Sequence, residues 1–181
     1  MEITKQQLTD IIGNAGRAEK YIGYINGWAE TFEITTPLRL VHFLAQVMHE
    51  TNGLLYMREL GQQIYFTKYE SGKLAKRLGN TQKGDGAKYR GRGFLQLTGR
   101  TNYQEYQDSD YCRGDIMSSP ELLEQPNGAT KSGMWFWMKS GLNELADKDD
   151  VLAITKKING GTNGLASRKK WLATCKKVLG L

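Results

Sequence analysis

Two glutamates that lie nine residues apart, Glu50 and Glu59, have a residue type and a spacing that suit acid–base chemistry. Glycoside hydrolysis needs one carboxylic acid to protonate the leaving oxygen and one carboxylate on the other side of the sugar. The segment that carries both, residues 42 to 60, reads HFLAQVMHETNGLLYMREL. Its central Thr-Asn-Gly stretch lets the chain reverse, so we expect Glu59 to stand opposite Glu50 on an extended segment.

A mostly buried helix is predicted to position Glu50. When residues 37 to 50 are projected at about 100° per residue, apolar side chains cover most of the circumference. Thr36 and Pro37 are typical of a helix start, and Asn52 and Gly53 are typical of a helix end. In the last turn, the helix dipole and partial burial both disfavour a charged Glu50, as a general acid requires. The remaining face is a polar stripe, which consists of Arg39, His42, Gln46, His49 and Glu50.

Helical patterns recur along most of the remaining chain. They predict helices over residues 3–12, 18–28, 99–107, 121–125, 128–139, 149–158 and 167–179. Residues 54–70 are richer in aromatic and extended-favouring types and predict a small hairpin, the only expected β region. Residues 79–93 carry five glycines among charged residues, so we expect a long ordered loop there that is too polar for the core.

The net positive charge of the chain comes entirely from residues 131–181. Residues 1–130 contain 15 basic and 15 acidic residues, whereas residues 131–181 contain 10 basic and 4 acidic ones. Such a patch attracts nucleic acid, an anionic membrane or an acidic cell-wall polymer. No nucleic-acid-binding motif accompanies the charge, which argues against a nucleic-acid partner.

The last predicted helix combines an apolar arc with one inward-facing cation. Arg168 falls inside the arc formed by Trp171, Leu172 and Cys175, so it must find a carboxylate or carbonyl partner. The lysines of this helix fall outside the arc and are expected to form a solvated face, with weak contacts to an anionic wall or membrane. They are Lys169, Lys170, Lys176 and Lys177.

The length of 181 residues suits a single domain, without a separate wall-binding domain. No run of eighteen apolar residues and no secretory signal is visible, so we expect synthesis in a host cytoplasm and action on the wall after release. Cys112 and Cys175 fit no metal or redox spacing, and whether they pair stays open.

Two segments together resemble a known enzyme family. One is His49-Glu50-Thr51 with Glu59, and the other is YRGRGFLQLTGRTNY over residues 89–103. They are similar to glycoside hydrolase family 19, the chitinases, and especially to compact phage endolysins of that family. NTQKGDG at residues 80–86 and INGG at residues 158–161 match further family segments. The resemblance covers roughly residues 38–168, and the long second block is its specific part.

The resemblance assigns roles by position. Glu50 would be the general acid and Glu59 the general base, and Thr98 would help to hold the attacking water. Arg168 would join the charge network of the acidic pair. The residues that would bind substrate are Gln96, Asn102, Tyr103, Asn159 and His49. The alternative for each residue is a structural role. Gln96 and Asn102 would then tie down the glycine-rich loop, Arg90 and Arg92 would anchor that loop, and His49 would be a partner near Glu50. His42 and His49 without a third ligand make a weak metal site, and the family needs no cofactor.

These features lead to a mainly α, α+β lysozyme-like fold in which two helical lobes flank a cleft with a small β-hairpin. The expected activity is hydrolysis of β-1,4 bonds in peptidoglycan by a monomeric, inverting enzyme, an endolysin that causes cytolysis. Plant-type chitinases have a longer insertion between acid and base, and the shorter one here favours a bulky peptidoglycan strand. The alternatives are a chitinase acting on N-acetylglucosamine polymers, a lytic transglycosylase, a non-catalytic wall-binding module and membrane disruption by the basic helix.

Overall fold

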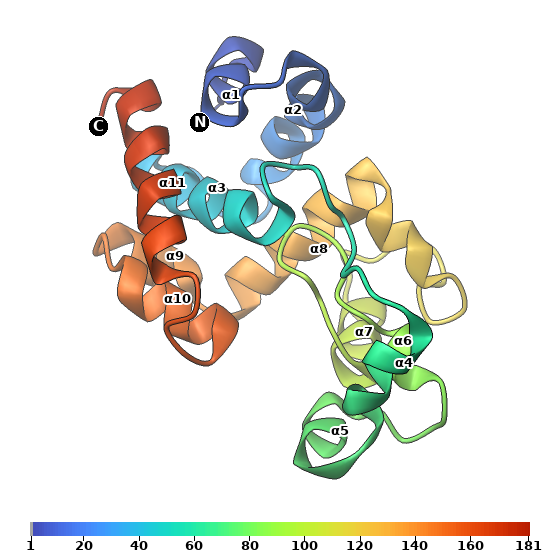
Figure 1. Ribbon diagram of the computed structural model, residues 1–181. Helices are drawn as coiled ribbons and strands as arrows, with labels where there is room; N and C mark the ends of the chain where they lie inside the picture. Colours follow the sequence, from blue (N-terminus) through green and yellow to red (C-terminus); the bar gives the residue numbers. More distant parts are fainter. Residues whose placement is uncertain (1) are drawn as a thin grey trace. The chain divides into compact units, whose positions relative to one another are not determined.

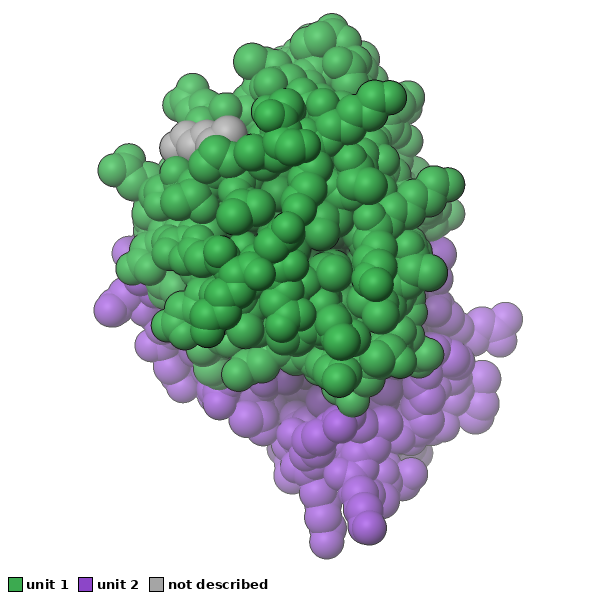
Figure 2. All heavy atoms as spheres, turned by 90° about the vertical axis from the view of Figure 1, so that its left-hand side faces the viewer, with its two compact units in different colours: residues 1–56, 134–181 green, residues 57–133 purple. Residues whose placement is uncertain are grey.

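The computed structural model describes residues 2–181, which fold almost entirely as helices (Figure 1). These residues form eleven α-helices and two short 3₁₀ helices, and they contain isolated β-bridges in place of named strands. The chain divides into two compact units (Figure 2). Unit 1 contains residues 1–56 and 134–181, and unit 2 contains residues 57–133.

Unit 1 is built around helix α3, which packs against α11 and α9. Thr36 caps α3 by accepting a hydrogen bond from the Arg39 N–H at 3.3 Å, and Pro37 occupies its first turn. Asn52 ends it in the left-handed conformation, at φ 51°. The predicted start and end of this helix are therefore confirmed. The helices of unit 1 are α1 (Lys5–Ile12), α2 (Ala15–Ala29), α3 (Pro37–Thr51), α9 (Leu142–Asp147), α10 (Val151–Asn159) and α11 (Leu165–Leu179).

Unit 2 consists of short helices joined by ordered loops. Helix α8 (Pro126–Lys139) begins in unit 2 and continues into unit 1. The predicted helices over residues 99–107 and 128–139 are confirmed by α7 and α8, and residues 121–125 form a 3₁₀ helix. The other elements of unit 2 are α4 (Gln63–Phe66), η1 (Thr67–Glu70), α5 (Gly72–Leu78), α6 (Asp85–Lys88), α7 (Arg100–Gln107) and η2 (Pro120–Glu124).

The prediction of a hairpin within residues 54–70 is wrong. Residues 63–70 form α4 and η1, and the bridges of this region join Arg58 to Arg92 and Arg92 to Leu97. The partner of the Glu59 segment is therefore a distant loop, with the Glu59 N–H donating to the Gly91 carbonyl at 2.8 Å. Phe66 is fully buried whereas Ile64 is 73% exposed, so the aromatic content of this segment reflects helical packing.

The segment over residues 79–93 is ordered, as expected, but part of it belongs to the core. Asp85, at 3% exposed, accepts hydrogen bonds from the N–H groups of Thr81 and Gln82, both at 3.0 Å. Its carboxylate also forms an ion pair with Arg100 at 2.5 Å. A Cβ on Gly86 would lie 2.2 Å from the Phe66 carbonyl oxygen, so only glycine permits this close approach. Asp85 and the small residues beside it therefore let a polar segment become buried.

The helix expected over residues 149–158 is confirmed by α10, and that over 167–179 by α11. Helices α4, α5, α6 and α9 lie outside the predicted set. Among residues 2–181, no helix is both long and apolar enough to span a membrane.

Candidate active site

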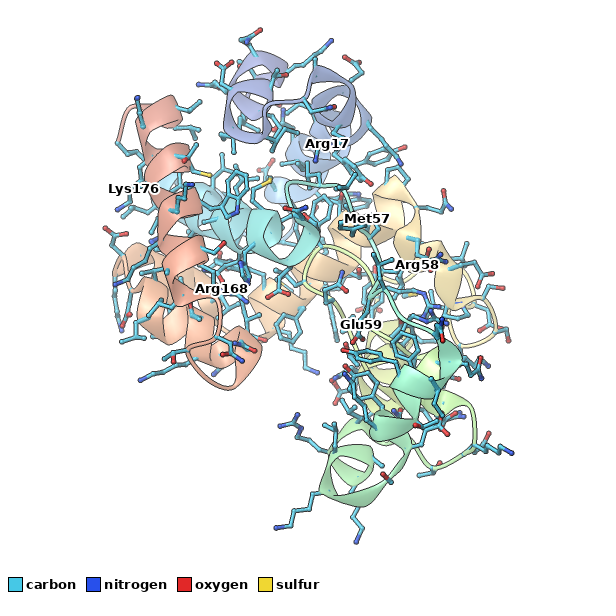
Figure 3. The ribbon with its side chains drawn as sticks, in the orientation of Figure 1. Arg17, Met57, Arg58, Glu59, Arg168 and Lys176 are labelled. Atoms are coloured by element: carbon cyan, nitrogen blue, oxygen red, sulfur yellow. The ribbon has the colours of Figure 1, made fainter. Side chains whose placement is uncertain are left out.

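Glu50 lies in the last turn of α3 and is held by an ion pair with Arg168. Figure 3 labels Arg168 on α11. Arg168 is 2% exposed, and its Nη2 donates to the Glu50 carboxylate. The expectation that Arg168 faces inward and pairs with a carboxylate is thus confirmed.

Gln46 supports the same ion pair from one turn earlier on α3. Its Oε1 accepts a hydrogen bond from Arg168 Nη1 at 2.5 Å, and its side chain is fully buried. Gln46 and Glu50 therefore accept hydrogen bonds from the two terminal nitrogens of the Arg168 guanidinium. Residues four apart on a helix share a face, which explains why the polar stripe places both beside Arg168.

His49 lies beside this ion pair and is fixed from two directions. Its Nδ1 is 2.9 Å from Ser167 Oγ, and a Cβ on Gly164 would lie only 2.3 Å from its Nε2. Burial lowers the pKa of His49, the charge of Arg168 lowers it further, and Glu50 acts in the opposite direction. His49 is therefore neutral at pH 7, with Ser167 as its hydrogen-bond partner and Glu50 as its neighbour in the chain.

The first half of the polar stripe is anchored separately. His42 is fully buried with Nε2 2.7 Å from Asp149 Oδ1, and Lys176 Nζ is 2.5 Å from Asp149 Oδ2. Arg39 forms an ion pair with Asp147 at 2.6 Å. Lys176 is therefore tied to Asp149, and the expectation that all four lysines of the last helix are simply solvated is wrong for this one.

Glu59 belongs to unit 2 and is oriented by three contacts. Its Oε1 accepts a hydrogen bond from the Tyr69 hydroxyl at 2.8 Å, and its Oε2 lies 3.4 Å from the Gly91 N–H. Lys68 Nζ lies 3.9 Å from Oε1. Burial is the main cause that raises the pKa of Tyr69, and its bond to Glu59 raises it further, so the hydroxyl keeps its proton. A carboxylate held this way presents a fixed lone pair to a water molecule.

Replacing Tyr69 with phenylalanine tests this orientation. We expect kcat to fall about tenfold with little change in KM, because hydrogen bonds to charged groups contribute about 1.5–3 kcal/mol and Tyr69 is partly exposed. Steady-state kinetics on a soluble glycan measure both constants. Tyr65→Phe is the matched control, since Tyr65 is exposed and contacts Lys68 through its ring. Equal losses from both variants would contradict the role of Tyr69.

Thr98 and Gln96 lie in the turn that follows Gly91, and Asn102 lies in the first turn of α7. Thr98 Oγ1 donates to the Gln96 carbonyl at 2.7 Å, and Asn102 Nδ2 donates to the Thr98 carbonyl at 2.7 Å. Gln96 has a left-handed backbone at φ 52°, and its Nε2 donates to the Gly93 carbonyl at 2.9 Å. All three remain partly exposed. The side-chain amides thus hold the turn, as in the loop-anchoring alternative, while Gln96 Oε1 and Thr98 Oγ1 lie close to Gly91.

Tyr103, Arg90 and Arg92 hold the loop in place through contacts inside unit 2. Tyr103 is fully buried, its hydroxyl donates to the Arg90 carbonyl at 2.7 Å, and burial raises its pKa to about 12. That burial leaves Tyr103 no surface for a sugar, so the substrate-binding role expected for it gives way to a positioning role. Arg92 binds Glu124 at 2.7 Å and the Lys88 carbonyl at 2.6 Å. Arg90 and Arg92 are therefore loop anchors.

Asn159 is exposed at the end of α10, where its Nδ2 donates to the Asn163 carbonyl at 3.0 Å. Cys112 and Cys175 are both buried free thiols, in unit 2 and unit 1 respectively. Among residues 2–181, no three His, Cys, Asp or Glu side chains are grouped so as to hold a metal ion.

The expected site residues thus form two clusters, one in each unit. The acid cluster of unit 1 contains Glu50, Arg168 and His49, and the base cluster of unit 2 contains Glu59, Thr98, Gln96 and Asn102. Sequence reasoning did not identify Gln46 or Tyr69 as contacts of these carboxylates. The position of Gln46 on the polar stripe of α3 could have indicated its contact with Arg168. The number of residues between Glu59 and Tyr69 gives no such indication of their hydrogen bond.

Comparison with known proteins identifies the family of the chain. The family model for class I chitinases, glycoside hydrolase family 19, matches residues 20–163. A glycosyl hydrolase family 19 domain-containing protein of Haemophilus influenzae is 33% identical over 156 residues, which are 71% of this chain and 74% of that protein. An endochitinase of Pisum sativum is 30% identical over 132 residues, which are 70% of this chain but 41% of the plant protein.

Solved structures show the same fold at lower identity. Chitinase C from Streptomyces griseus superimposes with a TM-score of 0.76 at 24% identity, covering 98% of this chain and 76% of that one. A bacterial family 19 chitinase gives a TM-score of 0.68 at 22% identity, covering 99% and 95%. With the family model matching most of its length, the chain belongs to glycoside hydrolase family 19 and is a glycoside hydrolase.

Proposed function

We propose that this protein hydrolyses β-1,4-glycosidic bonds of bacterial peptidoglycan as an endolysin, in a single catalytic domain. Glu50 protonates the leaving oxygen, and Glu59 activates a water that attacks from the opposite face, which inverts the anomeric centre. The observation that carries this proposal is the contrast between the two carboxylates. Glu50 is fixed by the buried Arg168, whereas Glu59 is oriented by the Tyr69 hydroxyl, the Gly91 N–H and, at 3.9 Å, Lys68.

The remaining residues of the base cluster complete the reaction. Thr98 Oγ1 lies on the same short turn as the Gly91 segment that contacts Glu59, so it is placed to bind the water that Glu59 activates. Gln96, Asn102 and Asn159 bind sugar through amide atoms that their loop contacts leave available. No cofactor enters this reaction, because the two carboxylates supply both proton transfers.

Two observations support peptidoglycan over a plain chitin chain. Glu59 follows Glu50 by only nine positions along the chain, so little polypeptide is available to cover a branched glycan. The net positive charge lies after residue 130, which suits a polyanionic wall. Chitin-type polymers of N-acetylglucosamine remain the second candidate, because the plant relatives are named endochitinases.

Mass spectrometry of digested glycans tests the proposal. Purified peptidoglycan and N-acetylglucosamine oligosaccharides are incubated with the protein and with its Glu50→Gln variant. Hydrated reducing ends released from peptidoglycan by the parent protein alone would support the proposal, and the identity of the end sugar reveals which bond is cut. Anhydromuramic ends would instead establish a lytic transglycosylase. Products from the oligosaccharides alone would establish a chitinase, and binding without product would establish a wall-binding module.

Surface charge on α11 should matter for walls and not for short glycans. Replacing Lys169, Lys170 and Lys177 with glutamine is expected to lower activity on whole walls roughly tenfold at low salt, because diffuse charge steers a polyanion. Screening over about 10 Å at 0.1 M salt should remove the difference. Turbidity clearing of walls and cleavage of a soluble glycan are measured in parallel.

Two further variants serve as controls for this prediction. Lys176 is left unchanged in the triple variant because it is bound to Asp149. Arg168→Gln should damage cleavage of both substrates, since it removes the buried partner of Glu50. Equal losses on walls and soluble glycan from the triple variant would show that these lysines do not act by steering.

A further inference from the structure

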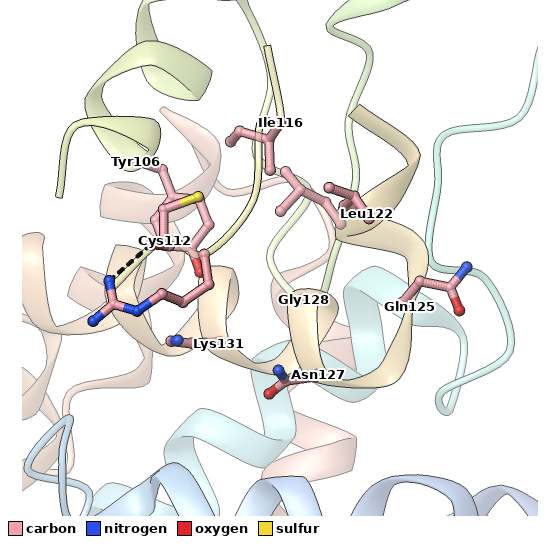
Figure 4. A pocket seen from close by; sticks show the side chains of 10 residues that line it. Tyr106, Cys112, Ile116, Leu122, Gln125, Asn127, Gly128 and Lys131 are labelled. Atoms are coloured by element: carbon pink, nitrogen blue, oxygen red, sulfur yellow. Dashed lines mark hydrogen bonds between the residues drawn. The ribbon is translucent and has the colours of Figure 1, made fainter. Parts of the chain in front are cut away.

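Unit 2 contains a cavity of about 160 Å³ that none of the residues of the acid and base clusters lines (Figure 4). Its walls come from the end of α7, the loop that follows, η2 and the first turns of α8. The lining residues are Tyr106, Cys112, Arg113, Ile116, Leu122, Leu123, Gln125, Asn127, Gly128 and Lys131.

Two cationic side chains border this cavity, and none of its ten lining residues is acidic. Lys131 is only 6% exposed, and its pKa is lowered by burial first and by the charge of Arg113 second. Arg113 is exposed and is steadied at the rim by donating to the carbonyls of Asp110 and Cys112, at 2.7 and 3.0 Å. Burial raises the pKa of the Cys112 thiol, so this group contributes no negative charge at neutral pH. An anion would therefore be stabilised here.

The opposite wall of the cavity is apolar. Ile116 and Leu123 are both 1% exposed, and Leu122 is partly exposed at the rim. A Cβ on Gly128 would lie 2.1 Å from the Leu122 carbonyl oxygen, so α8 and η2 are in close contact at this wall. A small inorganic anion would leave these hydrocarbon surfaces uncovered, whereas a ligand with an apolar body would bury them.

We propose that this cavity binds a small carboxylate with a short apolar body. The carboxylate lies against Lys131 and Arg113, and the hydrocarbon lies against Ile116, Leu122 and Leu123. Two sources carry this chemistry, a free short-chain acid and the C-terminal alanine of a peptidoglycan stem peptide. The second source rests on the proposed peptidoglycan activity, whereas the binding chemistry itself does not.

Calorimetric titration without any glycan tests the site independently of hydrolysis. Isovalerate is expected to bind at one site, and its neutral isostere isovaleramide is expected to bind at least tenfold more weakly, because charge-assisted hydrogen bonds contribute about 1.5–3 kcal/mol. Inorganic phosphate should also bind more weakly. Equal binding of the amide, or tighter binding of phosphate, would overturn the proposal.

Matched variants locate the site. Lys131→Met keeps most of the side-chain volume and should weaken isovalerate at least tenfold. Circular dichroism shows whether Lys131→Met folds. Arg113 lies at the surface, so Arg113→Gln measures isovalerate binding at the same site if Lys131→Met does not fold. Lys83→Met removes an exposed lysine elsewhere in unit 2 and should leave binding unchanged. Parent-like binding by the first two variants would refute the assignment.

N-acetyl-D-alanine distinguishes the two sources. Tighter binding than isovalerate would assign the site to a stem-peptide terminus, and weaker binding would assign it to a free acid. Since every titration is made on the intact protein without turnover, a failure of this site and a failure of the proposed hydrolysis give separate results.

Discussion

Glu50→Gln is expected to lower the rate of glycan hydrolysis by at least about 100-fold, the usual contribution of general acid catalysis. The amide oxygen can still accept a hydrogen bond from Arg168, but the amide cannot deliver a proton to the leaving oxygen. Hydrolysis of a soluble glycan is measured with circular dichroism of the same sample. Retention of more than a tenth of the activity would remove Glu50 from the mechanism.

The ion pair with Arg168 calls for a stability control. Glutamine at position 50 leaves a buried guanidinium without the carboxylate it contacts, so the melting temperature should also fall. Gln46→Met removes the other acceptor of Arg168 without removing the proton donor. We expect Gln46→Met to destabilise the fold to a similar extent while retaining much more activity than Glu50→Gln. Matching activity losses would mean that the effect at position 50 is structural.

Glu59→Gln is expected to lose most activity, again by about 100-fold or more, because an amide cannot take the proton of the attacking water. In Glu59→Ala, added azide should partly restore turnover, since a small anionic nucleophile needs no general base. Nuclear magnetic resonance of the product then reads the anomeric configuration. A glycosyl azide of inverted configuration is the expected result.

The configuration of the native product supplies the decisive comparison. Inversion in the parent reaction agrees with water attacking in a single displacement. Retention would make Glu59 a nucleophile that forms a covalent intermediate, and the proposed mechanism would then fail. Tyr69→Phe distinguishes loss of orientation from loss of the base, because it keeps the carboxylate of Glu59 and removes only the hydrogen bond at 2.8 Å.

Features encoded by local sequence were predicted well. Helix α3 was located by its apolar pattern, its Thr36 cap and its Asn52 stop, which act within a few residues. The inward direction of Arg168 followed from the angular position of one residue on one helix. The chain segments with a strong helical period therefore predicted the mainly helical character of the fold and the inward direction of Arg168.

Features that depend on distant partners were not predicted. Residues 54–70 are rich in aromatic and extended-favouring types, which predicts a hairpin, yet Arg58 pairs with Arg92 and residues 63–70 form helices. A short apolar segment does not distinguish the two outcomes, because its tertiary neighbours decide. The bond from Tyr69 to Glu59 likewise requires the turn geometry of α4 and η1, which spacing alone does not show.

Gly164 and His49 restrict the order in which this protein can change during evolution. Gly164 has a φ of 74°, and any side chain there would collide with the His49 ring. A substitution at 164 is therefore accessible only after the imidazole has been replaced by a smaller group, and it still carries the strain of a left-handed backbone. Combinatorial libraries should accordingly contain variants with a small residue at 49 alone, or at both positions, but almost none changed at 164 alone. Substitution of His49 would therefore have to precede substitution of Gly164.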